Sequence, residues 1–296
     1  MDFFALLQES PPFLLLTVTV VGLCVGSFLN VVIVRLPVMM EAEWQQQCRE
    51  LLDLPGENNG NEAGHPPAKF NLVHPGSHCP KCRAPIKAIH NIPVLSYFLL
   101  KGRCAACQTE ISLRYPLIEL ITAVVSFIVA WRFGFSWAGL GGLFLSWALI
   151  ALTMIDFDHQ LLPDAITLPF LWLGILFNMN GVYTDLSASV IGAVAGYLSL
   201  WSIYMIFKLV TGKEGMGYGD FKLFALLGAW LGWQALPGII LLSSLVGAVV
   251  GISLILFRGR DRNIPIPFGP YLATAGWIFL VWGGEITTSY WRLIGL

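Results

Sequence analysis

The sequence predicts an all-α polytopic membrane protein with about eight transmembrane helices and one polar loop inserted between helices 1 and 2. Of its 296 residues, 56% are hydrophobic and only 12% are charged, and the mean hydropathy is +0.71. Ordinary soluble domains carry about 25% charged residues. Most of the polar side chains fall between residues 35 and 112, and the remaining sequence is almost continuously apolar. A soluble segment therefore interrupts a membrane body.

Eight segments are long enough to be membrane spans, since a helix needs about 20 mostly apolar residues to cross about 30 Å of hydrocarbon. They are 12–34, 113–131, 136–155, 162–180, 186–210, 221–236, 238–257 and 267–284. The sixth is short and runs almost directly into the seventh, so seven spans are the alternative. We expect three parts: a first transmembrane helix in 1–34, the loop 35–112, and a transmembrane domain 113–296.

The positive charges predict an orientation, because Lys and Arg accumulate in the cytoplasmic loops of membrane proteins. With a periplasmic N-terminus and eight spans, all 17 Lys and Arg except Arg132 and Arg292 lie inside. With seven spans, the loops after the missing span would change to the other side of the membrane, and the asymmetry of Lys and Arg would be lost. The N-terminus carries Asp2 and Glu9 instead of the positive region of a secretory signal, which predicts a first span that is retained.

Net charge and glycine spacing carry less information about function. The net charge of −1 supplies no basic surface for nucleic acid, so we expect no nucleic-acid partner. Small residues four apart let helices approach closely in lipid; chance in a glycine-rich chain is the alternative for any one pair. The pairs are Gly22 and Gly26, Gly192 and Gly196, Gly228 and Gly232, and Gly247 and Gly251.

Four of the six cysteines form two CxxC motifs that are typical of a zinc site. The motifs are Cys79-Pro-Lys-Cys82 and Cys104-Ala-Ala-Cys107, with 21 residues between them. Each motif supplies two thiolates from one tight turn, and four thiolates close a tetrahedral, structural site. Two disulfides are the alternative, but the charge pattern places this loop in the reducing cytoplasm. The other two cysteines, Cys24 and Cys48, are read as incidental.

Acidic residues gather in two loops that the alternation of spans brings to one membrane face. Asp156, Asp158 and Asp164 lie between the third and fourth spans, and Gly217-Tyr218-Gly219-Asp220 lies between the fifth and sixth. Ionisable groups at membrane depth indicate function by default. Two carboxylates that share one proton can act as acid and base on water. The glycines at 217 and 219 would let the backbone approach a substrate or adopt a special turn.

Helix capping is the alternative for each aspartate that stands at a helix start. Asp220 precedes an apolar run, and Pro163-Asp164 is typical of a first turn in which Asp complements the helix dipole. Asp156 instead closes a helix, where a negative charge is unfavourable. Capping therefore does not explain the whole cluster.

An ordered set of motifs across nearly the whole chain resembles the type IV prepilin peptidases, the GxGD aspartyl proteases of type IV pilus and type II secretion systems. The set comprises Gly26-Ser27-Phe28-Leu29-Asn30 with Arg35-Leu36-Pro37, the four-cysteine loop, Asn91-Ile92-Pro93, Arg114-Tyr115-Pro116-Leu117-Ile118-Glu119, Asp156 to Asp164, Gly217-Tyr218-Gly219-Asp220, and Pro265-Ile266-Pro267-Phe268-Gly269-Pro270.

The resemblance implies an enzyme of the bacterial inner membrane with Asp156 and Asp220 as catalytic pair at the cytoplasmic face. The resemblance also implies supporting roles for other members of the two aspartate motifs, namely Asp158 and Asp164 near Asp156, and Gly217 and Gly219 before Asp220. The implied substrates are prepilins and pseudopilins in the membrane, cut after a glycine that ends a short basic leader. The enzyme then methylates the new N-terminus with S-adenosylmethionine.

The methyl transfer rests on the resemblance alone, because the sequence has no Gly-rich fingerprint for the cofactor. Asn30 and Glu119 are the candidates for binding it; a packing hydrogen bond between helices is the alternative for Glu119. A proton-coupled transporter is the rival function, since inward carboxylates and glycines also build proton relays. Against it, no internal repeat is visible. A membrane anchor with a partner-binding loop would leave the aspartates unexplained.

Overall fold

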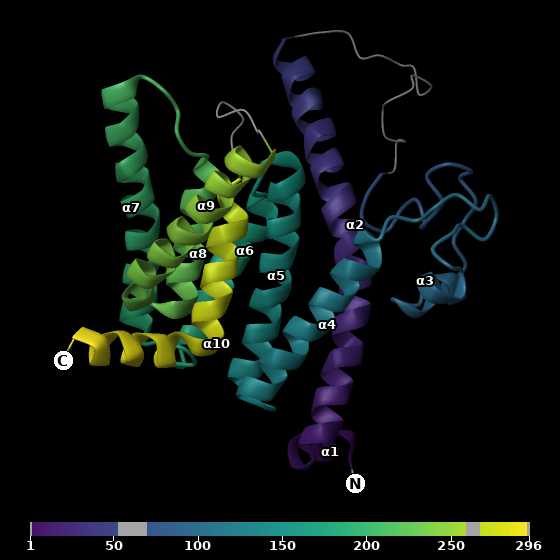
Figure 1. Cartoon of the computed structure of the whole chain (residues 1–296), viewed down its shortest axis with the longest axis horizontal. Helices are drawn as coiled ribbons and strands as arrows, with labels where there is room; N and C mark the ends of the chain where they lie inside the picture. The colour runs from purple at the N-terminus through teal and green to yellow at the C-terminus, as the bar shows by residue number, and fades with distance from the viewer. Residues whose placement is uncertain (1, 53–69, 259–266, 295–296) are drawn as a thin grey trace. The chain divides into compact units, whose positions relative to one another are not determined.

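A computed structural model describes residues 2–52, 70–258 and 267–294, and it is built from helices (Figure 1). Within these ranges there is no strand, only two isolated β-bridges in the loop. The all-α prediction is confirmed. The helices are α1 Phe3–Glu9, α2 Pro11–Leu51, η1 Ala88–Asn91, α3 Leu95–Leu99, α4 Arg114–Phe133, α5 Trp137–His159, α6 Asp164–Asn178, α7 Leu186–Thr211, α8 Tyr218–Leu231, η2 Trp233–Ala235, α9 Leu236–Arg258 and α10 Gly269–Ile294.

Each of the eight predicted spans contains a helix, but the helices differ in their fitness to cross a bilayer. Within the described residues, five helices are long and apolar enough by length and composition, and α6 is a shorter apolar helix. The five are Pro11–Leu51, Arg114–Phe133, Trp137–His159, Leu186–Thr211 and Trp233–Leu254. The chain is thus a multi-pass membrane protein, and eight crossings remain a prediction.

The first helix is longer than the sequence predicts, since α2 has 41 residues and continues to Leu51. The added segment after position 34 is rich in Glu, Gln, Met, Arg and Leu, which are good helix formers. Pro37 lies inside the helix and does not end it. The polar loop therefore begins with a helical extension of the first span.

The chain divides into two compact units, and the first comprises Pro12–Ile128. In it α2 packs against α4 through the predicted glycine pair. A Cβ atom at Gly22 would lie 2.7 Å from Ser126 Oγ, and one at Gly26 would lie 2.6 Å from Glu119 Cα. Only glycine permits this approach of the two helices.

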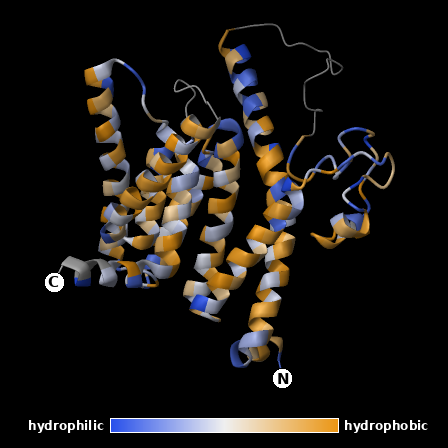
Figure 2. Ribbon diagram, viewed as in Figure 1, coloured by the Kyte–Doolittle hydropathy of each residue, from blue (hydrophilic) through white to orange (hydrophobic). Residues whose placement is uncertain are grey.

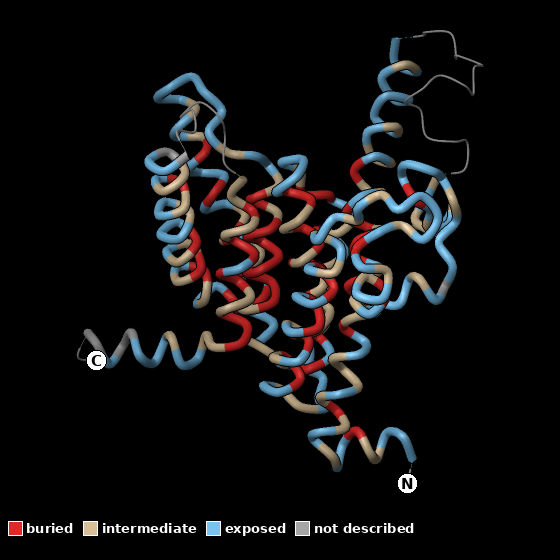
Figure 3. The backbone as a smooth tube through the Cα atoms, turned by 45° about the vertical axis from the view of Figure 1, so that its right-hand side comes forward, coloured by how far each residue is buried: buried red, intermediate tan, exposed pale blue. Residues whose placement is uncertain are grey.

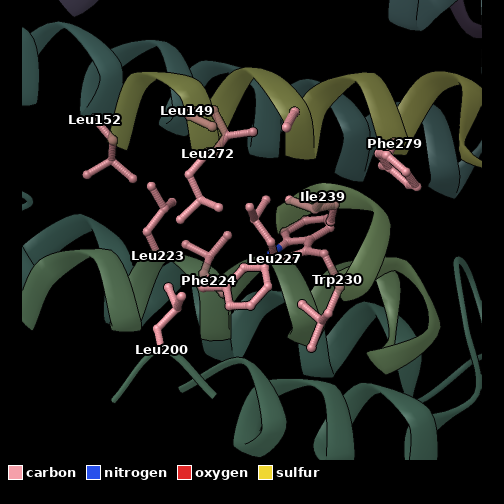
Figure 4. Close-up of a cluster of buried hydrophobic side chains, with 14 of the residues drawn as sticks. Leu149, Leu152, Leu200, Leu223, Phe224, Leu227, Trp230, Ile239, Leu272 and Phe279 are labelled. Atoms are coloured by element: carbon pink, nitrogen blue, oxygen red, sulfur yellow. The ribbon is translucent and has the colours of Figure 1, made fainter. Parts of the chain in front are cut away.

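The second unit comprises Met1–Pro11 and Val129–Leu296, and α8 lies at its centre. Ten residues of α8 are buried in succession from Asp220 to Trp230 apart from the partly exposed Lys222. Figure 3 shows the buried backbone of this unit in red. The apolar side chains of α8 pack with residues of α5, α7, α9 and α10 (Figure 4). Trp230 is fully buried and donates its indole N–H to Phe170 O at 2.8 Å.

Glycines bring α7 against α8. Gly192 faces the backbone of Gly228, and a Cβ atom at Gly196 would lie 2.7 Å from Phe224 O. Gly232 ends α8 with a φ of +80°, which a residue with a side chain rarely adopts. Helix α8 therefore ends after 14 residues, fewer than a usual span contains.

Candidate active site and metal centre

Asp156 lies in the last turn of α5 and is 5% exposed. Its backbone carbonyl accepts the capping N–H of Gln160, whose φ of +53° ends the helix. Among the described residues, its Oδ2 is the buried side-chain oxygen or nitrogen that has no hydrogen-bond partner. A buried carboxylate at the negative end of a helix dipole is costly, and packing does not explain it.

Asp220 lies in the first turn of α8 and is 8% exposed. The N-cap residue of α8 is Gly217, so the alternative reading of Asp220 as the N-cap itself is wrong by three positions. Its carboxylate does interact with the backbone amide of Gly217, as the third residue does in a capping box. Asp220 therefore both stabilises the helix start and presents a buried acid there.

The two aspartates meet at one end of the second unit, although 64 residues of sequence separate them. The charge of Asp156 acts on the Asp220 carboxylate, so the two groups repel each other when both are ionised. The start of α10 joins the same place, because the Asp156 carboxylate interacts with the backbone amide of Gly269. Three helix ends thus converge on a pair of buried carboxylates.

Leu162 fills the space beside the aspartates and explains two glycines. A Cβ atom at Gly219 would lie 2.8 Å from Leu162 Cβ, and one at Gly269 would lie 3.4 Å from Leu162 Cδ1 and 2.5 Å from Asp156 Oδ2. Gly217 has an ordinary φ of −79°, and a Cβ atom there would lie 3.7 Å from Asp220 Oδ2, an ordinary contact distance. A special turn is therefore not the reason for either glycine of the motif; close packing accounts for Gly219.

The other two aspartates of the cluster occupy the rim of this site. Asp158 is exposed at the end of α5. Asp164 begins α6, and both of its carboxylate oxygens lie 2.7 Å from Lys222 Nζ in α8. This ion pair ties the first turn of α6 to the first turn of α8, two residues after Asp220.

The four cysteines of the loop form a possible metal site in the first unit. Their sulfur atoms all lie within 4.8 Å of one another, and the sulfurs of Cys79 and Cys107 are 3.7 Å apart. A tetrahedron with metal–sulfur bonds of about 2.3 Å has edges of about 3.8 Å. The sulfurs are too far apart for a disulfide and match the spacing of ligands around one ion.

The two CxxC turns repeat the same backbone geometry. In the first, Cys79 N donates to Ala84 O at 3.0 Å and Arg83 N to Cys79 O at 2.9 Å. In the second, Cys104 N donates to Thr109 O at 2.8 Å and Gln108 N to Cys104 O at 3.0 Å. Arg83 and Gln108 both have a φ of +57°. The spacing of the cysteines predicted the two turns. Because both turns have the same backbone hydrogen bonds, each holds its two cysteine side chains in a similar arrangement.

The local environment favours thiolates at two of these positions. The side chain and backbone of Thr109 lower the pKa of Cys107 to about 6, and the amides of Cys82 and Lys81 lower the pKa of Cys79. For Cys82 the Ala84 amide acts downward, but desolvation and the three neighbouring sulfurs raise its pKa to about 11. Binding of a divalent ion would release the protons of any remaining thiols, because only thiolates coordinate the metal.

Asn30 and Glu119 both lie buried in the first unit and both have internal partners. Asn30 Nδ2 donates to Tyr115 O at 3.1 Å, and Glu119 Oε2 accepts the backbone N–H of Val94 at 2.7 Å. Glu119 also hydrogen-bonds with Ser27 of α2. A hydrogen bond between helices, the alternative weighed for Glu119, is present.

Sequence reasoning missed three residues of the site. Lys222 entered only the count of positive charges, although its place two residues after Asp220 was visible. Leu162 is one of many leucines, and no local signal marks it. Gly269 belongs to a motif that we quoted without a role; Pro265 and Ile266 of that motif lie outside the described residues.

Two family models match the chain. Residues 20–133 match the bacterial peptidase A24 N-terminal domain, and residues 143–252 match the type IV leader peptidase family. The first match contains the four cysteines, Asn30 and Glu119, and the second contains both buried aspartates. No solved structure matches.

Curated relatives match along nearly the whole length of the chain. A protein of Stutzerimonas stutzeri is 55% identical over 96% of this chain and 96% of its own. One of Pseudomonas putida is 52% identical over 100% of both chains. One of Neisseria gonorrhoeae is 52% identical over 96% of this chain and 94% of its own. All three are named prepilin leader peptidase/N-methyltransferase, and none of the matches supports a transporter.

Proposed function

This chain belongs to the type IV leader peptidase family, and we propose that it cleaves prepilin leaders with Asp156 and Asp220 and then methylates the new N-terminus. One observation supports the assignment of the catalytic pair more than any other. Two buried carboxylates, from helix ends far apart in sequence, interact electrostatically at one site.

The proposed cleavage adds water directly to the scissile peptide. One aspartate, as a carboxylate, takes a proton from water while the water oxygen adds to the carbonyl carbon. The other aspartate, as a carboxylic acid, donates a proton to the carbonyl oxygen. The tetrahedral diol then collapses: the protonated base gives its proton to the leaving nitrogen as the C–N bond breaks, and a diol hydroxyl returns a proton to the other carboxylate. Two interacting carboxylates at one buried site cannot both ionise easily, so the proposed pair begins with one shared proton.

The substrates fit the location of the aspartates. A prepilin lies in the bilayer as an apolar helix with its leader outside the hydrocarbon, so its scissile bond lies near one membrane face. We propose that this face is the cytoplasmic face of a bacterial inner membrane and that the N-terminus is periplasmic. The support is the distribution of Lys and Arg, which leaves Arg132 and Arg292 on the other side.

The four-cysteine loop is proposed to hold zinc. Cys79, Cys82, Cys104 and Cys107 would supply four thiolates, which leave no coordination position for water, so the ion stabilises the loop and does not hydrolyse peptides. S-adenosylmethionine would supply the methyl group. Asn30 and Glu119 remain the candidates for contacts with it, and both lie in the same unit as the loop.

The test is cleavage of a purified prepilin by the purified enzyme and by its Asp156→Asn and Asp220→Asn variants. Because each substitution removes an acid or base while retaining the shape, we expect cleavage to fall by a factor of about 10²–10⁴. Glu43→Gln, on an exposed part of α2, is the control and should cleave normally. Full cleavage by both aspartate variants, with unchanged metal content, would remove the carboxylate pair from the mechanism.

A further inference from the structure

Helix α3 presents an apolar face that no other described segment covers. Leu95 is 53% exposed, and Phe98 and Leu99 are each 70% exposed. Ile89 and Ile92, just before the helix, are also exposed. In Figure 2 much of this short helix is orange, and much of the loop around it is blue. Contiguous exposed apolar side chains mark an interaction surface.

The short helix is held firmly in place. Ser96 is buried, its amide donates to Ile92 O at 3.1 Å, and its hydroxyl donates to His90 O at 2.5 Å. Val94, which precedes α3, has a φ of +59°, a costly conformation for a β-branched residue. Its amide donates to Glu119 of α4, which offsets that cost. The exposed apolar face therefore does not turn inward.

The bond to Glu119 sets the depth of α3 relative to a membrane span. Helix α4 has 20 residues, just enough to cross about 30 Å of hydrocarbon, and it begins at Arg114. Glu119 lies five residues farther on, about 7.5 Å along the helix at 1.5 Å per residue. Since Val94 N is 2.7 Å from Glu119 Oε2, α3 starts beside the span at that depth. In a bilayer that α4 spans from Arg114, this depth corresponds to the boundary between lipid headgroups and acyl chains.

The charges near α3 match a membrane surface. Between residues 70 and 112 Glu110 is the single acidic residue, whereas five positive side chains are present. They are Lys81, Arg83, Lys87, Lys101 and Arg103; all are exposed, and Lys101 and Arg103 directly follow α3. Basic residues beside an apolar face are typical of segments that bind anionic lipid at the interface.

We propose that α3 is a membrane-surface anchor: Leu95, Phe98 and Leu99 insert at the boundary between headgroups and acyl chains, and Lys101 and Arg103, which directly follow the helix, contact anionic headgroups. The anchor seats the four-cysteine loop on the bilayer beside α4. It binds lipid, not a protein partner. The inference rests on α4 being a span and does not depend on the proposed peptidase activity.

The test uses photo-crosslinking of the full chain in nanodiscs that contain phosphatidylglycerol and phosphatidylethanolamine. Phe98 is replaced by p-benzoylphenylalanine, illuminated and analysed by mass spectrometry. Lys81, an exposed residue in the first CxxC turn, is the control position. We expect a phospholipid adduct at position 98 and none at position 81. Adducts only to peptides of this chain, or equal lipid adducts at both positions, would overturn the proposal.

A second measurement avoids the photo-crosslinking residue, which could itself disturb the loop. In the double variant Phe98→Ser/Leu99→Ser, both substitutions are at exposed positions, so folding within the loop should persist. We expect hydrogen exchange of residues 95–100 to rise in nanodiscs while metal content stays at one ion per chain. Equal exchange in the variant and the wild type would contradict insertion of these side chains.

Discussion

Asp156 and Asp220 are positioned by packed helices, whereas the four cysteines are positioned by two short turns. Around the aspartates, α8 is buried on nearly every side by apolar residues of its neighbours. Between residues 70 and 112, Cys79 is the one apolar side chain buried among those described, and backbone hydrogen bonds shape the turns. The aspartate site is thus stabilised by a hydrophobic core, whereas the four-cysteine loop has almost no core and would depend on a bound metal ion.

Metal removal should have the largest effect, and it should be confined to the loop. Structural zinc contributes about 10–16 kcal/mol to small metal-dependent folds. Chelation, or the Cys79→Ser substitution, should therefore increase hydrogen exchange across residues 77–111 strongly. Acidification should act in the same direction, because protons compete with the ion for the thiolates.

Cleavage in the other region should survive this loss better than methylation does. Mass spectrometry of the processed pilin measures both activities in one sample. Equal loss of cleavage and methylation in Cys79→Ser would show that the two regions do not act separately.

A smaller effect is expected from one added methyl group between α7 and α8. In Gly196→Ala the new Cβ atom would lie 2.7 Å from Phe224 O, so the helices must separate. Overpacking of this kind costs about 1–3 kcal/mol. The melting temperature and the cleavage rate should both fall, because Asp220 lies on the displaced helix.

The matched control is Gly284→Ala in α10, where no atom lies within 4 Å of the added methyl group. This variant should melt and cleave as the wild type does. If both variants behave alike, close packing of α8 does not position the acid.

The smallest effect should come from the ion pair at the rim of the site. Its side chains are partly exposed, at 29% for Lys222 and 53% for Asp164, so solvent screens the attraction. Lys222→Met should cost no more than about 1 kcal/mol of stability. Its cleavage rate should nevertheless fall, because the pair fixes the first turn of α8. A Lys213→Met control on the neighbouring exposed loop should show neither change.

The sequence predicted functional residues better where they lie close together in the chain than where helix packing brings them together. Two CxxC motifs indicate a thiolate cluster by spacing alone, and their sulfurs do lie together. The length of α2 was underestimated because the span was predicted from hydropathy, which falls after residue 34, whereas the helix continues through polar residues of high helix propensity to Leu51. Leu162, Gly269 and Lys222 could not be assigned to the aspartates, since their roles depend on long-range packing that no periodicity records.

The most direct measurement asks whether positions 156 and 220 are close in the membrane. The variant Asp156→Cys/Asp220→Cys, in a Cys24→Ser/Cys48→Ser background with the four-cysteine site loaded, is given a protease site in the exposed loop at Lys213. After oxidation and cleavage of that loop, the two fragments should migrate together until reductant is added. Fragments that separate without reductant, as in the single-cysteine variants, would contradict a shared carboxylate site.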